Sequence, residues 1–118
     1  SEPSDVYTVA VQVDQFDSTQ IALVLDNCWA TPINQMDYSI HWDLIINKCP
    51  SPNGRMVSVL QNGVSTSSYF SFGMFTFASF SPKISLHCQV HLSLQKTGNK
   101  RQVKNEALIF HWHLQFMH

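Results

Sequence analysis

Cysteines are the residues whose number and positions most restrict the chemistry of this chain. Cys28, Cys49 and Cys88 are an odd set, so at most one disulfide can form within the chain. Cys28 ends the second of the predicted strands and Cys88 lies midway along the sixth, so one interpretation is a bridge that links two facing sheets. Such a bridge would stabilise the fold by about 4 kcal/mol in the chain-entropy model. The other interpretation is three reduced, buried cysteines in a cytosolic β-domain.

Histidines in the last third of the chain suggest a metal site. His111 and His113 flank Trp112 and would share one side of a strand, a spacing that can present two nitrogen ligands to one ion. His87, His91 and His118 belong to the same third. No thiol or carboxylate completes a ligand set nearby, and alternating histidines on the solvent face of a strand are ordinary. We therefore expect neither a metal ion nor another cofactor.

Catalytic groups form no recognisable motif. Only guesswork would place Asp26, Asp37 and Asp43 near the histidine-bearing strand ends, and the sequence has no nucleophile elbow, phosphate loop or metalloprotease motif. We expect a protein that is not an enzyme.

Composition limits the remaining classes of protein. The 118 residues suffice for one domain, with 44% hydrophobic and 13% charged residues, and 7 Lys and Arg nearly balance 8 Asp and Glu. This argues against disorder and against a nucleic-acid binder with a basic face. The longest apolar run, residues 21–25, is too short to cross a bilayer. Because residues 1–5 are polar, we expect any signal peptide and any membrane anchor to lie outside this chain.

Apolar residues recur with a period of two, which predicts an all-β chain. Polar clusters rich in proline, glycine, asparagine and serine separate the apolar stretches, and this organisation is typical of an immunoglobulin-like β-sandwich of about seven strands. A parity change near Gly73 predicts a bulge or twist there. The seven stretches are residues 7–13, 21–25, 42–46, 57–61, 69–77, 84–94 and 108–116.

Several segments together resemble the C-terminal half of a zona pellucida (ZP) module, the ZP-C subdomain. The likeness is greatest to the uromodulin, zymogen-granule glycoprotein and tectorin branch of that family. It rests on a Cys-Trp-Ala-Thr-Pro start, a Cys-Pro second cysteine and an aromatic block with alternating phenylalanines, in the family's order. The segments are residues 23–32, 42–50, 61–63, 67–77 and 86–92.

The resemblance implies an extracellular, secreted glycoprotein domain that copolymerises into filaments or matrix with other ZP-module subunits. It also implies an N-terminal ZP half in the full-length protein and a disulfide between Cys28 and Cys88. The partner cysteine that the family would supply for Cys49 is missing, and Ser93 stands where another is expected. We therefore expect Cys49 to be unpaired.

The pattern of the C-terminal residues predicts that the chain has three parts. We expect a ZP-C-like domain at residues 1–94, a charged linker at 95–106 and a hydrophobic strand at 107–118. Lys100 and Arg101 offer a dibasic cleavage site, after which the family has a propeptide strand that blocks premature polymerisation. The apolar residues of that strand here would be Leu108, Phe110, Trp112, Leu114 and Phe116. The alternative is a divergent ending that never belonged to the module.

The sequence thus favours a structural and assembly module, which pairs with its neighbours through exposed strand edges. Two alternatives stay open. One is a receptor domain that binds a protein or glycan without polymerising. The other is a truncated variant with no independent function.

Overall fold

A computed structural model describes residues 6–13, 21–53, 56–73, 83–94 and 102–115. These residues form eight strands and no helix, which confirms the predicted all-β class. This is one strand more than the roughly seven predicted, and the additional strand is the two-residue β4. The strands are β1 (Val6–Gln12), β2 (Ile21–Thr31), β3 (Trp42–Ile46), β4 (Cys49–Pro50), β5 (Ser58–Gln61), β6 (Ser67–Gly73), β7 (Lys83–Leu94) and β8 (Gln102–Gln115).

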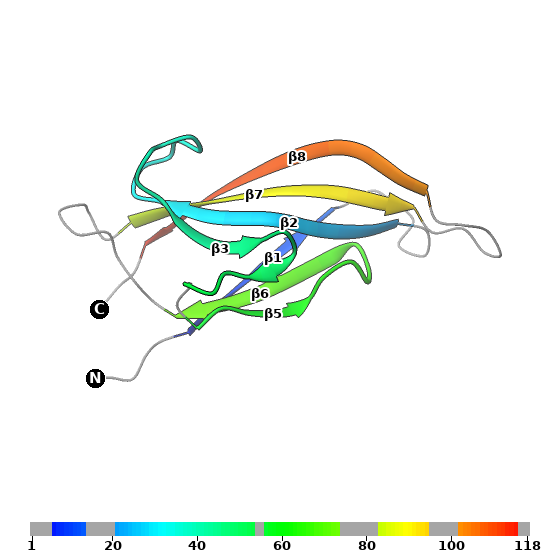
Figure 1. Ribbon diagram of the computed structural model, residues 1–118, viewed down its shortest axis with the longest axis horizontal. Coiled ribbons are helices and arrows are strands. Elements are labelled where there is room, and N and C mark those ends of the chain that lie inside the picture. The colour runs from blue at the N-terminus through cyan, green and yellow to red at the C-terminus, as the bar shows by residue number, and fades with distance from the viewer. Residues whose placement is uncertain (1–5, 14–20, 54–55, 74–82, 95–101, 116–118) are drawn as a thin grey trace.

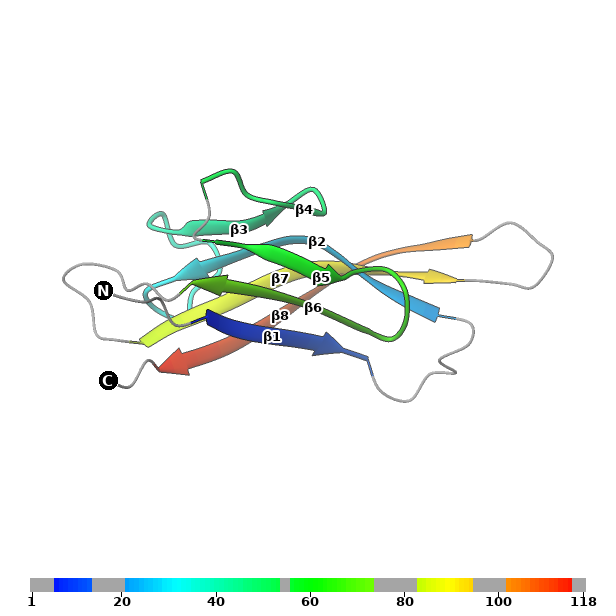
Figure 2. The ribbon, with the colours of Figure 1, turned by 90° about the horizontal axis from the view of Figure 1, so that it is seen from below.

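Two antiparallel sheets face each other as a β-sandwich (Figures 1 and 2). One sheet has the order β1-β6-β5 and the other has the order β4-β3-β2-β7-β8. The long strands β2, β7 and β8 run along the longest dimension of the molecule, which measures 52 Å. The predicted immunoglobulin-like sandwich is confirmed.

Alternation of apolar and polar residues places the core between the sheets. In β1, Val9 and Val11 are buried while Thr8 and Ala10 are exposed. In β6, the buried Phe70 and Phe72 pack against the same core. The bulge predicted near Gly73 would involve residues after β6 that lie outside the described part.

The strand β2 is central, as its density of apolar residues predicts, but it continues three residues past Cys28 to Thr31. Its register with β7 shifts between Leu25 and Asn27, so Asp26 forms a bulge. A second shift, between Cys28 and Trp29, affects its pairing with β3 and buries Leu44 and Ile45 together. Alternation over residues 42–46 places Trp42, Leu44 and Ile46 on one face, and this expectation is wrong at Ile46, which is exposed.

The disulfide between Cys28 and Cys88 is present, but it does not link the two sheets. Both residues are buried in the core, and they are register partners on the adjacent strands β2 and β7, with Cα atoms 4.1 Å apart. The predicted pairing is confirmed and the predicted bridge between facing sheets is wrong. The cause is that β2 and β7 are neighbours in one sheet, which strand periodicity does not reveal.

Hydrogen bonds from the turn between β5 and β6 join the sheets instead. The side chain of Asn62 accepts a hydrogen bond from the Leu25 amide at 2.7 Å and donates one to the Leu25 carbonyl at 3.0 Å. Gly63, at a φ of 80°, donates its amide to the Leu23 carbonyl at 2.9 Å. The turn thus bonds to β2 as a neighbouring strand would, along the part of β2 that does not pair with β3. The positive φ of residue 63 requires glycine at that position.

One end of the outer face of β7 is also covered. His87, expected on the solvent face, is fully buried, and so is Ser85 on the same side of β7. The His87 ring lies against Trp29, with centroids 5.6 Å apart, and its Nε2 is 2.8 Å from the Thr31 hydroxyl. The expectation of an exposed histidine face is therefore wrong at His87, because side chains of β2 cover that position.

Candidate functional site

The strand β8 occupies the outer edge of the five-stranded sheet. Its backbone pairs antiparallel with β7 over almost the whole length of both strands, from Lys83 opposite Gln115 to Leu94 opposite Gln102 (Figure 1). The register is interrupted once, between Val90 and Leu92. An edge strand of this kind forms hydrogen bonds with the backbone N–H and C=O groups along one side of β7, which would otherwise be unpaired.

The residues predicted to cover that edge fall within β8 as far as it is described. In order along β8, Leu108, Phe110, Trp112 and Leu114 pair with Val90, Cys88, Leu86 and Ile84. Phe116 and the predicted cleavage residues Lys100 and Arg101 lie outside the described residues. The arrangement brings the candidate covering strand directly beside the disulfide, since Cys88 is the register partner of Phe110.

Cys49 lies at the opposite edge of the same sheet. It forms β4 with Pro50, is exposed, and makes no disulfide. Two strands of the sheet order, β3 and β2, separate it from β7. That Cys49 has no disulfide partner in the full-length protein stays a prediction.

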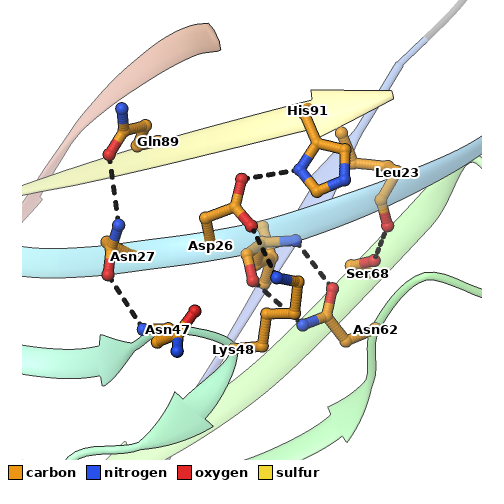
Figure 3. A network of polar contacts seen from close by, with 10 residues as sticks. Leu23, Asp26, Asn27, Asn47, Lys48, Asn62, Ser68, Gln89 and His91 are labelled. Carbon is orange, nitrogen blue, oxygen red and sulfur yellow. Dashed lines mark hydrogen bonds and ion pairs between the residues drawn. The ribbon is translucent and has the colours of Figure 1, made fainter. Parts of the chain in front are cut away.

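A charged cluster surrounds the bulge at Asp26 (Figure 3). One carboxylate oxygen of Asp26 lies 2.7 Å from His91 Nδ1, and the other lies 3.4 Å from Lys48 Nζ. The Lys48 amide donates to the Asp26 carbonyl at 2.8 Å. Asn47 and Lys48 have φ values of 50° and 74°, so they form a tight left-handed turn between β3 and β4. The contacts between Asp26 and Lys48 hold this turn against β2.

Asn27, in β2, extends this network from β7 to the turn between β3 and β4. Its side-chain Nδ2 donates to Gln89 Oε1 at 3.1 Å, and its side-chain Oδ1 accepts from the backbone amide of Asn47 at 2.9 Å (Figure 3). The β3–β4 hairpin is thus fastened to the bulge of β2 by side chains that are polar and partly buried. Sequence reasoning missed Asn27, since nothing in the local pattern marks it.

An open groove of about 520 Å³ lies beside this network on the outer face of the sheet. The aromatic rings of Trp29 and Tyr38 line it together with the carboxylates of Asp37 and Asp43. The Trp29 indole donates to the Met36 carbonyl at 2.9 Å and so fastens residues 32–41 over the sheet.

Two of the aspartates singled out in the sequence each lie beside a histidine. Asp26 meets His91, and Asp43 lies 3.6 Å from Nε2 of the exposed His41. His111 and His113 belong to β8, opposite His87 and Ser85, whereas His118 is outside the described residues. Within the described part of the chain, no group of three His, Cys, Asp or Glu is placed to hold a metal ion.

The described segments also contain no helix that is long and apolar enough to span a membrane.

Comparison with known proteins gives a consistent set of matches. The ZP-C domain model of the zona pellucida family matches residues 2–103. The pancreatic secretory granule membrane major glycoprotein GP2 of Mus musculus is 37% identical over 84 residues, which are 71% of this chain and 16% of that protein. The Homo sapiens GP2 is 33% identical over 113 residues, covering 91% of this chain and 21% of that protein. Uromodulin of Rattus norvegicus is 33% identical over 84 residues, or 71% of this chain and 13% of that protein. The chain thus spans about a fifth or less of the length of these relatives.

Proposed function

Because the chain belongs to the zona pellucida family, as a ZP-C domain, we propose that it is a non-catalytic assembly module of an extracellular glycoprotein. In this proposal it polymerises with other ZP-module subunits, and the full-length protein supplies an N-terminal ZP half. A disulfide between Cys28 and Cys88 suits an oxidising compartment outside the cytosol.

The observation that carries the proposal is the position of β8. It is an edge strand, it follows the basic connection that contains Lys100 and Arg101, and it pairs with nearly all of β7. Its release would leave the backbone donors and acceptors on that side of β7 unpaired, next to an apolar row that includes Leu86, Cys88 and Val90. A free edge of this length pairs readily with another chain. We propose that β8 is the cover that postpones this pairing.

The proposal predicts that cleavage after Arg101 activates association. The folded chain is cut by a protease specific for dibasic sites, and the β8 fragment is removed by gel filtration. The thermal midpoint should fall by several degrees because the paired edge is lost, and sedimentation velocity should show oligomers that grow with concentration.

The matched control is the chain incubated with inactivated protease, which keeps Lys100 and Arg101, remains uncut and should form no oligomers beyond those of the untreated chain. A cleaved chain that stays monomeric and melts at the original temperature, with its β8 fragment demonstrably gone, would refute the covering role.

A further inference from the structure

Charges are segregated along the sequence. Residues 1–43 contain seven of the 8 acidic residues and none of the 7 basic ones, and all of the Lys and Arg occur from Lys48 onward. The acidic residues are Glu2, Asp5, Asp14, Asp17, Asp26, Asp37, Asp43 and, alone in the second half, Glu106. Three of the basic residues, Lys96, Lys100 and Arg101, lie in the connection between β7 and β8, residues 95–101. The chain therefore carries opposite charges on different parts of its length.

Two of the acidic residues line the groove described above. Asp37 and Asp43 line it and are exposed, and no Lys or Arg is among the described residues that line it. Asp26, by contrast, is already paired with Lys48 and His91. The partner of Asp43 is the exposed His41, at the long distance of 3.6 Å, so its carboxylate stays accessible.

Aromatic rings give the groove a second means of binding cations. Trp29 and Tyr38 line it, and the hydrogen bond from the Trp29 indole to Met36 fixes the ring and the covering segment together. A Lys ammonium or Arg guanidinium is attracted by the face of such a ring and more strongly when carboxylates lie beside it. The chemistry of the groove thus fits a basic, extended peptide segment.

The connection of the same copy cannot reach the groove. Trp29 is level with His87 in the ladder, and β7 continues to Leu94 before the connection begins, about 23 Å further on at roughly 3.3 Å per residue. Figure 1 shows the end of β7 and the start of β8 at the opposite side of the molecule from residues 32–41. From Leu94 to Gln102 the backbone spans at most about 28 Å, so it cannot travel to the groove and return.

We propose that the groove binds the basic connection, residues 95–101, of a second copy of this chain. The two copies then meet head to tail, through different surfaces of each. A contact of this heterologous type leaves one groove and one basic connection free at the ends, so it can extend into a filament. This inference rests on the proposed assembly role, and it names a contact distinct from the edge of β7.

The test measures binding of a synthetic peptide with the sequence of residues 95–101, terminally blocked, to the intact chain. Chemical shifts of the tryptophan indole N–H groups follow the titration, assigned with a Trp29→Phe variant. Saturable binding that weakens as NaCl rises is expected, with the Trp29 signal moving most. A peptide with Gln in place of Lys96, Lys100 and Arg101 should not bind.

Two protein variants locate the contact. Asp37→Asn with Asp43→Asn should weaken peptide binding at least tenfold, while Asp37→Glu with Asp43→Glu keeps the charge and should retain most of it. Unchanged binding by the Asn variant, or equal affinity for an unrelated peptide with the same number of basic residues, overturns the inference. Absence of binding overturns it too, yet leaves the cleavage experiment on β8 unaffected, because no peptide contact is needed for β7 to become exposed.

Discussion

At the scale of single residues, Asn62 is the side chain that most directly connects the two sheets. It satisfies both the amide and the carbonyl of Leu25, a residue with no exposed surface. The Asn-Gly dipeptide predicts the turn that contains Asn62, since this pair favours tight left-handed turns. Its bonding to β2 could not be predicted, because that contact spans 37 residues of sequence.

The variant Asn62→Ala should reduce the free energy of unfolding by about 2–4 kcal/mol, since it leaves two buried backbone groups without partners. Urea unfolding of the oxidised protein, followed by circular dichroism, measures the change. The control is Asn53→Ala, in an exposed turn, which should alter stability by less than about 0.5 kcal/mol. Equal effects of the two substitutions would mean that Asn62 does not join the sheets.

Burial of His87 shows the limit of the periodic pattern at this scale. Alternation correctly separates Ile84, Leu86 and Cys88 from Ser85 and His87, so it assigns the two faces of β7. It cannot tell which outward positions are covered, because the covering groups Trp29 and Thr31 belong to another strand. The result is a buried polar contact at a position that the sequence presents as solvent-exposed.

At the scale of elements, the strands were largely predictable and their partners were not. Alternation places β1, β6 and β7 with their core faces, because each has one face toward the opposite sheet. The alternation expected in β3 is wrong, because a register shift against β2 buries the consecutive residues Leu44 and Ile45. Pairing of β2 with β7 likewise joins segments that lie 60 residues apart at the disulfide, and local sequence contains no signal for it.

The disulfide therefore stabilises a single pair of neighbouring strands and the long loop between them. Reduction should lower the free energy of unfolding by about 4 kcal/mol in the chain-entropy model. The measurement compares urea unfolding with and without a phosphine reductant in a Cys49→Ser background, which removes the exposed thiol. Cys49→Ser by itself should leave the midpoint unchanged, and an oxidised chain no more stable than the reduced one would contradict this role.

At the scale of the whole molecule, the sequence resemblance anticipated more than the residue patterns did. The likeness to ZP-C and the Cys28–Cys88 pairing are both confirmed, whereas composition and periodicity reached only an all-β domain. The groove was not predicted at all. It requires residues 32–41 to lie over the ends of β2 and β3, and an arrangement of that kind depends on the packed sheet.

If β8 is a removable cover, then it should also act when it is supplied separately. Chain cleaved after Arg101 and freed of its fragment is mixed with a synthetic peptide of residues 102–115, the length of β8. Binding to the folded state should raise the thermal midpoint as peptide is added, by about 2.7 kcal/mol in stability at a hundredfold excess over Kd, and should suppress oligomers in sedimentation velocity.

The control peptide carries Ile109→Pro and Phe110→Pro, beside Gln89 and Cys88 in the register. Successive amides of an antiparallel strand point to opposite sides, so two adjacent prolines remove at least one donor to β7 and disturb the ladder. This peptide should neither stabilise the cleaved chain nor prevent its association. Equal activity of the two peptides would mean that the effect comes from nonspecific apolar contact, and that β8 does not protect β7 by strand pairing.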